Sequence, residues 1–136
     1  MKVTISRKAH FNSAHRLYRS DWDDKKNKRI FGKCSNKNFH GHNYKLIVSV
    51  TGKIDPETGF VMDIKRLKEI IKIEVEDYFD HKNLNLDVPE FNNLNPTTEN
   101  IVVVIYNKLV KHISDNYSLE VLLFETPRNF AKYSGQ

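Results

Sequence analysis

The sequence predicts an α+β fold, in which an antiparallel β-sheet carries two helices packed on one face. Segments that alternate polar and apolar residues, as half-buried strands do, occur near both ends of the 136-residue chain. Segments with apolar residues at every third or fourth position, as in amphipathic helices, lie between them. Because the strands come in pairs and the helices are grouped, the pattern favours an antiparallel sheet. The expected order is ββααββ, within a single domain at residues 1–136.

Two strands are expected in the first half of the chain. Residues 3–11 and 42–51 each place apolar side chains on one face of an extended segment. The turn-forming pairs Asp-Pro and Thr-Gly follow the second segment, and an extended apolar run resumes at residues 60–62. We therefore expect a hairpin around residues 52–59, with residues 60–62 in its second strand.

Two amphipathic helices are expected next. Asp63 is placed to cap a helix over residues 64–79, in which apolar residues recur at steps of three and four. Thr97 or Thr98 can cap a second helix over residues 98–113, whose apolar face has the same period. The caps set where each helix begins.

The remaining segments are expected to be two loops and two closing strands. Residues 16–33 mix Lys and Arg with Asp and keep no helical or strand period, which indicates an exposed loop. Residues 80–96 are dense in Asn, Asp and Pro and predict a long ordered loop, a kind of segment that often carries function. Residues 119–125 and 130–136 predict two strands joined by a turn at residues 126–129.

Composition limits the classes of function. The single cysteine excludes an internal disulfide and favours a reducing, cytoplasmic location. No run of about 18 apolar residues is present, and the N-terminal segment alternates like a strand, so we expect a soluble protein with no signal peptide and no membrane partner. The formal charge of +5 has no RNA-binding aromatic motif or long basic helix beside it, so we expect no nucleic-acid partner.

A pair of histidines indicates half of a zinc site. His40 and His42 are separated by one residue at the start of a strand, so their side chains point to the same side. The alternative is a pair of polar residues at the start of a strand. A zinc site needs a third ligand, for which the sequence offers His10, His15, His81 and His112, and the last of these is also explained by the dipole at a helix C-terminus.

Three further groups have chemistry that spacing alone does not settle. Cys34 is compatible with a small apolar residue, a fourth zinc ligand, or a thiolate base or nucleophile. Asp80 beside His81 suggests a general acid/base pair, although adjacent side chains often point apart. Glu125 falls on the apolar face of its strand, where a carboxylate is costly without a partner, so it either lies beyond the sheet or accepts hydrogen bonds from a ligand.

Taken together, these segments resemble the 6-pyruvoyltetrahydropterin synthase family along almost the whole chain. The resemblance is carried by FNSAHRL, GKCSNKNFHGHNYK, TGKIDPETGFVMD, FDHKNLNLDVPEF with NPTTEN, and FETPRNFAKYSG. It implies a T-fold, in which three subunits close their sheets into a barrel, two such rings stack as a homohexamer, and active sites form at subunit interfaces. Closure of this kind removes exposed sheet edges.

The resemblance also implies roles for individual residues. His15, His40 and His42 would bind zinc, and Cys34 would be a proton-abstracting base rather than a fourth ligand. Asp80 and His81 would form the partner acid/base pair. Glu125 would anchor the pterin through a bidentate hydrogen bond, with Thr98 also contacting the substrate. The implied activity is a zinc-dependent lyase reaction that converts 7,8-dihydroneopterin triphosphate to 6-pyruvoyltetrahydropterin and releases triphosphate, with zinc as Lewis acid.

Two other functions remain open from the sequence. The related 6-carboxytetrahydropterin synthases of queuosine biosynthesis share fold, metal and substrate, release acetaldehyde, and typically have fewer residues between the cysteine and the histidine pair than the five found here. A non-catalytic, zinc-stabilised binding module is the second alternative. Phe39, where the family often has a small residue, and Gln136, in place of an expected Glu, depart from the family pattern. Basic residues such as Arg16 and Lys33 are candidates for contact with the triphosphate.

Overall fold

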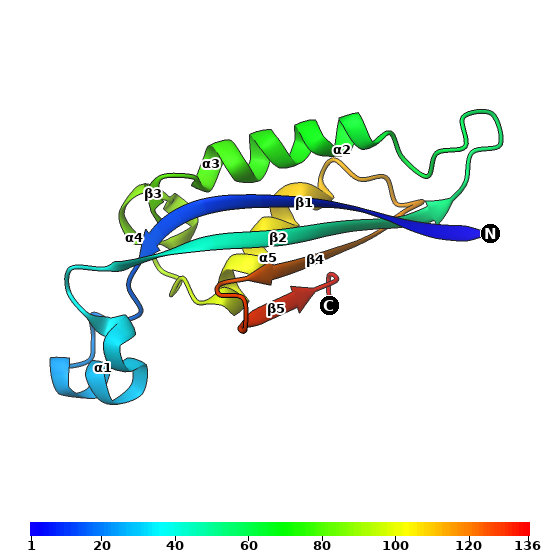
Figure 1. Ribbon diagram of the computed structural model, residues 1–136. Helices are drawn as coiled ribbons and strands as arrows, with labels where there is room; N and C mark the ends of the chain where they lie inside the picture. The colour runs from blue at the N-terminus through cyan, green and yellow to red at the C-terminus, as the bar shows by residue number, and fades with distance from the viewer.

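One mixed sheet organises the protein. The structure is a computed structural model that describes all residues, Met1–Gln136. Its sheet has the strand order β3-β1-β2-β4-β5 (Figure 1). The strands are β1 (Lys2–His15), β2 (His40–Lys53), β3 (Lys82–Asn83), β4 (Ser118–Phe124) and β5 (Phe130–Tyr133). All neighbouring pairs are antiparallel except the short β1–β3 pair, so the sheet is antiparallel as expected apart from one parallel edge.

Two helical segments cover one face of this sheet, which confirms the predicted α+β class. The first consists of α2 (Ile64–Ile71), a π-helical turn (Lys72–Glu76) and α3 (Asp77–Phe79), and it lies along β1 (Figure 1). The second, α5 (Thr98–Val110), lies along β4. Asp63 caps the first helix by accepting a hydrogen bond from the Lys65 backbone, and Thr97 caps the second by accepting one from Asn100.

The hydrophobic core lies between the sheet and these helices. It contains 22 buried apolar residues, among them alternate residues of the central strand β2 and the inner faces of both helices. Burial on this scale is the main stabilising contribution of the fold. The outer face of the sheet carries hydroxyl pairs instead, such as Thr4 with Thr51 at 2.6 Å between the side-chain oxygens.

Two local predictions were wrong, for different reasons. Residues 60–62 form no strand: Asp55 donates a backbone hydrogen bond to the Phe60 carbonyl across a tight turn, and both edges of β2 are already paired with β1 and β4. Residues 16–33 are not entirely loop, because they contain α1 (Asp24–Phe31), capped by the Asp23 side chain. Only Asn27 of α1 is buried, so the helix leaves no apolar period in the sequence.

The long segment before α5 is ordered, as predicted, but contains short elements. These are β3, α4 (Leu84–Asp87) and a 3₁₀ turn (Pro89–Phe91). Leu84, Val88 and Phe91 from this segment are buried in the core, which holds the loop against the helices. The second helix ends at Val110, so Ile113 lies beyond it. None of the helices has the length and apolar character needed to cross a bilayer.

Candidate active site

The pairing of β1 with β2 brings three histidines together. In this antiparallel register His15 lies opposite His40, and Ser13 lies opposite His42, so all three histidine side chains fall on the inner face of the two strands. One ligand nitrogen from each of His15, His40 and His42 lies within 4.8 Å of the others. We call these residues the three-histidine cluster. The ring centroids are 4.6 Å apart for His15 and His40 and 5.0 Å apart for His40 and His42.

The nitrogens of this cluster fit a metal ion. Both ring nitrogens of His40 and Nε2 of His42 are buried without a hydrogen-bond partner. An orphaned buried nitrogen is costly, and a bound cation would satisfy it. Imidazole nitrogen is a preferred zinc ligand, and a set of three leaves a position open for water or substrate. Cys34 does not belong to the group of potential ligands.

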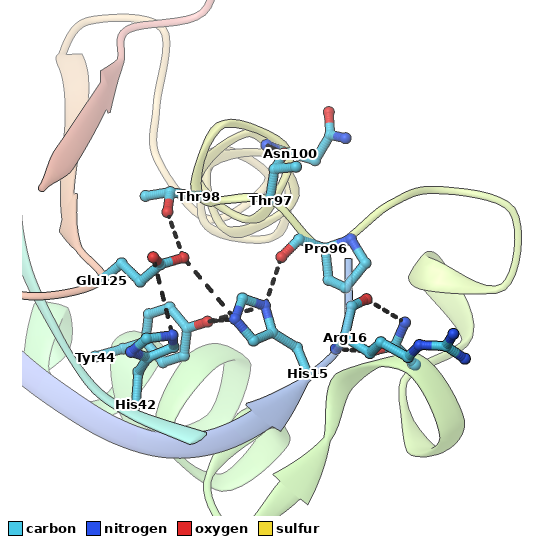
Figure 2. Close-up of polar contacts among 10 residues, drawn as sticks. His15, Arg16, His42, Tyr44, Pro96, Thr97, Thr98, Asn100 and Glu125 are labelled. Carbon is cyan, nitrogen blue, oxygen red and sulfur yellow. Dashed lines mark hydrogen bonds and ion pairs between the residues drawn. The ribbon is translucent and has the colours of Figure 1, made fainter. Parts of the chain in front are cut away.

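A backbone carbonyl and a side-chain hydroxyl orient the His15 ring. His15 Nδ1 lies 2.8 Å from the carbonyl oxygen of Pro96 (Figure 2). A carbonyl only accepts, so Nδ1 carries the proton and the lone pair of Nε2 faces the cluster. The hydroxyl of Tyr44 lies 3.3 Å from Nδ1 and 3.4 Å from Nε2.

Burial keeps this imidazole neutral. The His15 residue is completely buried, and burial lowers its pKa to about 4, with a further contribution from the neighbouring His40. Burial and then the charge of His42 also lower the pKa of His40. Neutral imidazoles are the form that binds a metal, so the site favours metal over protons.

Pro96 and Tyr44 were missed in the sequence analysis. The Pro96 contact is made by a backbone carbonyl, which has no side-chain signal. Tyr44 was treated only as one of the apolar residues of its strand; its position two residues after His42, on the same face, was the available indication that its hydroxyl lies near the cluster.

Glu125 lies directly beside the three-histidine cluster. It follows the last residue of β4, and its carboxylate accepts a 2.8 Å hydrogen bond from the Thr98 hydroxyl at the start of α5 (Figure 2). One carboxylate oxygen lies 3.9 Å from His15 Nε2 and the other lies 3.9 Å from His42 Nε2. The structure therefore brings both predicted substrate-binding residues, Glu125 and Thr98, next to the predicted metal ligands.

Cys34 lies in a short turn near this group. The 3₁₀ turn Gly32–Ser35, here called the Cys34 turn, follows α1 and leaves the cysteine partly buried. Burial raises the pKa of the Cys34 thiol, and the negative charge of Glu125 raises it further. The thiol therefore needs a nearby positive charge to become a thiolate at neutral pH.

Asp80 and His81 form the expected pair, but the pair lies outside the three-histidine cluster. His81 Nδ1 lies 2.8 Å from Asp80 Oδ2, and the other carboxylate oxygen accepts a 2.7 Å hydrogen bond from the Asn12 backbone. That bond is the main reason why the pKa of Asp80 is lowered. The pair lies beside Asn12 on the edge of β1 that pairs with β3, the His81 side chain is 83% exposed, and neither residue contacts the three-histidine cluster or Cys34 through a hydrogen bond or ion pair.

The remaining histidines lie elsewhere. His10 is on β1, five residues before His15, and its side chain is on the opposite face of the sheet. His112 lies just beyond α5, where its Nε2 is 3.7 Å from a carboxylate oxygen of Glu74. Neither of them belongs to the potential metal-binding group.

Comparisons with known proteins agree with this architecture. The family model described as 6-pyruvoyl tetrahydropterin synthase matches residues 4–136. The 6-pyruvoyl tetrahydrobiopterin synthases of Pongo abelii and Homo sapiens are 44% and 42% identical to this chain, over 99% of its length and 93% of theirs. The structure of Caenorhabditis elegans 6-pyruvoyl tetrahydropterin synthase superposes with a TM-score of 0.93 at 38% identity, covering 100% of this chain and 97% of that one. The chain belongs to the 6-pyruvoyl tetrahydropterin synthase family.

Proposed function

We propose that the protein is a zinc-dependent lyase that converts 7,8-dihydroneopterin triphosphate to 6-pyruvoyltetrahydropterin and triphosphate. The observation that carries this proposal is the convergence of the three-histidine cluster with Glu125 in a member of this family. Loss of triphosphate and migration of hydrogens within the substrate balance the reaction. No external oxidant or reductant is needed.

His15, His40 and His42 would hold the metal. Their orphaned nitrogens and the fixed His15 tautomer support this assignment. When bound there, zinc supplies Lewis-acid polarisation of substrate oxygens and so makes adjacent carbon-bound protons more acidic. The nitrogen donor set also suits zinc better than magnesium or calcium, which prefer oxygen ligands.

Glu125 would recognise the pterin ring. A carboxylate accepts two hydrogen bonds from the 2-amino group and the adjacent ring N–H of a pterin, a match that favours one orientation of the substrate. Thr98 holds one carboxylate oxygen at 2.8 Å, which limits rotation of the group. A pterin held in this way would direct its side chain, which carries the reacting carbons, toward the metal ligands.

Cys34 would remove a proton from the substrate side chain. In the metal-free protein its pKa is raised by burial and by Glu125, so the thiolate is disfavoured. A cation held by the three-histidine cluster would favour the thiolate, because a nearby positive charge stabilises it. The base would therefore become active only when the metal site is filled.

Asp80 and His81 would complete the site of a neighbouring copy. The Asp80 carboxylate fixes the His81 ring through Nδ1, which leaves Nε2 free to exchange a proton. Within one chain this exposed pair lies beside Asn12 on the edge of β1 that pairs with β3, without a hydrogen bond or ion pair to Cys34. Assembly of the sheets into a barrel and then a homohexamer would bring the pair of one subunit to the site of another and cover the open sheet edges.

The test is to supply the purified protein with 7,8-dihydroneopterin triphosphate and measure zinc content, triphosphate release and the pterin product. We expect stoichiometric zinc and a 6-pyruvoyl product, with turnover lost in Cys34→Ala while zinc is retained. His42→Ala serves as the comparison that loses metal as well. A 6-carboxy product with acetaldehyde would contradict the pyruvoyl assignment, and an inert zinc protein would support a binding module.

A further inference from the structure

Residues 16–18, immediately after His15, are each hydrogen-bonded to a different segment of the chain. The Arg16 backbone N–H donates to Asn85 Oδ1 at 2.8 Å, and the Asn85 amide donates back to the Arg16 carbonyl at 2.9 Å. The Leu17 N–H donates to the Cys34 carbonyl at 2.8 Å. The Tyr18 N–H donates to Asn95 Oδ1 at 3.3 Å. These residues therefore connect the metal-ligand strand to α4, to the Cys34 turn and to the loop before α5.

The Arg16 side chain adds a second connection to the Cys34 turn. Its Nε donates a 2.8 Å hydrogen bond to the carbonyl of Ser35, and its guanidinium carbon lies 3.8 Å from the centre of the Tyr18 ring. Figure 2 shows the side chain extending away from His15 and Glu125. In this chain Arg16 is thus placed to hold the turn and not to contact a ligand at the cluster.

Arg16 also differs from the neighbouring cations. Arg19 pairs with Asp21 at 2.7 Å, and Lys37 pairs with Asp24 at 3.3 Å, whereas Arg16 is in no ion pair. A planar guanidinium that donates in its own plane and stacks on an aromatic ring gives a fixed geometry, which the flexible ammonium of lysine does not provide. The contacts of Arg16 therefore fix the direction of its side chain, and they do not neutralise a nearby acidic group.

The Cys34 turn depends on these hydrogen bonds because little else holds it. Ser35 is its only buried residue and the preceding α1 buries only Asn27, so neither segment places an apolar residue in the core; Phe31 of α1 stacks on Trp22. Two adjacent carbonyls, those of Cys34 and Ser35, accept hydrogen bonds from Leu17 and Arg16. We propose that Arg16 is a positioning residue that fixes the Cys34 thiol relative to the three-histidine cluster.

As far as it concerns turnover, this inference rests on the proposed function. A displacement of about 1 Å can reduce the rate of a positioned reaction by about 100-fold.

Three variants test the role of Arg16. Arg16→Met keeps an aliphatic stem but removes the donor and the ring-stacking plane, and Arg16→Lys keeps the charge. Arg19→Met is the matched control in the same segment. The measurements are kcat, KM, zinc content and the rate at which iodoacetamide alkylates Cys34 in metal-free protein.

We expect kcat to fall by roughly tenfold or more in Arg16→Met, with KM changed by less than about threefold and zinc retained. Alkylation of the partly buried thiol in Arg16→Met should accelerate by roughly threefold or more. Arg16→Lys should restore neither kcat nor the alkylation rate of wild type, and Arg19→Met should match wild type in both. If Arg16→Met does not fold, the kcat and alkylation rate of Arg16→Lys test the proposal instead.

Three results would overturn the inference: alkylation in Arg16→Met within about twofold of wild type, full recovery in Arg16→Lys, or equal changes in Arg19→Met. A wild-type protein that is inert toward the triphosphate would overturn the proposed function, and the alkylation rates would still decide the role of Arg16. Alkylation is therefore the readout that separates the two failures.

Discussion

The carbonyl oxygen of Pro96 lies 2.8 Å from Nδ1 of His15 and fixes the proton of that imidazole on the side away from the cluster. Pro96 ends the loop before α5, while His15 ends β1, so the contact joins residues 81 positions apart in the sequence. It holds a neutral, fully buried ring whose other nitrogen is free for a metal.

Burial of His15 predicts an acid-sensitive metal-free protein. Its pKa is about 4 when folded, against 6.5 for an unperturbed histidine, so between these values the unfolded chain binds the additional proton. The stabilising contribution is complete above pH 6.5 and is lost as the pH falls to 4. We expect the fall from pH 6.5 to pH 4 to lower the free energy of unfolding by about 3 kcal/mol. Urea unfolding of protein treated with a chelator measures this change.

A matched pair of variants isolates the contribution of His15. His15→Gln should flatten the pH dependence between pH 6.5 and 4, whereas His112→Gln, which changes a histidine outside the site, should leave the slope as in wild type. Equal slopes in wild type and His15→Gln would show that another group controls the acid sensitivity.

The fold was largely predictable because long strands and helices repeat their pattern. Alternation over residues 42–51 identified the inner face of β2, and the capping residues Asp63 and Thr97 identified the starts of both helices. Elements with little apolar burial were not predictable. The helix α1 buries only Asn27, and β3 is defined by pairing of Lys82 and Asn83 with β1 rather than by a pattern of its own.

The candidate site was predictable only in part. The spacing of His40 and His42 placed them on one face, but the choice of His15 came from the family resemblance, because periodicity does not give the register between two strands. The separation of His81 from Cys34 depends on tertiary structure in the same way. A backbone group such as the Pro96 carbonyl has no residue type that would reveal it.

Removal of the Glu125 charge should weaken substrate binding more than metal binding. Glu125→Gln keeps the size of the side chain but leaves an amide, which repels one of the two pterin donors, so we expect KM to rise by roughly 10- to 100-fold with zinc content unchanged. Glu120→Gln, in the same strand β4 and close to Lys132, is the control that should behave as wild type. A wild-type KM in Glu125→Gln would exclude the anchoring role.

The hydrogen bond from Thr98 to Glu125 should have a smaller effect. Thr98→Val removes the 2.8 Å contact but keeps the shape of the side chain. Loss of one hydrogen bond to a charged group predicts a rise in KM of about 10-fold, and no further rise in the double variant with Glu125→Gln. Additive effects of the two substitutions would show that Thr98 acts independently of the carboxylate.

Separation of Cys34 from the Asp80–His81 pair predicts complementation between inactive variants. Cys34→Ala and His81→Ala, unfolded and refolded together, should form mixed assemblies in which some sites receive both functional groups. Random mixing in equal amounts gives such a site about one time in four, so we expect roughly a quarter of wild-type turnover. Cys34→Ala refolded alone is the control, and mixed assemblies without activity would place both groups in one subunit.

Phe39, directly before the metal-ligand candidate His40, has a backbone φ of 66°, in the left-handed region that bulky side chains avoid. It does not belong to the hydrophobic core, so its burial offsets little of a strain of about 1–2 kcal/mol. We expect Phe39→Gly to be about 1 kcal/mol more stable than Phe39→Ala, which removes the ring but keeps the strained Cβ. This corresponds to a difference of roughly 3 °C in unfolding temperature, measurable by calorimetry. Equal stability of the two variants would show that the backbone relaxes at this position, and that the φ of Phe39 stores no strain beside His40.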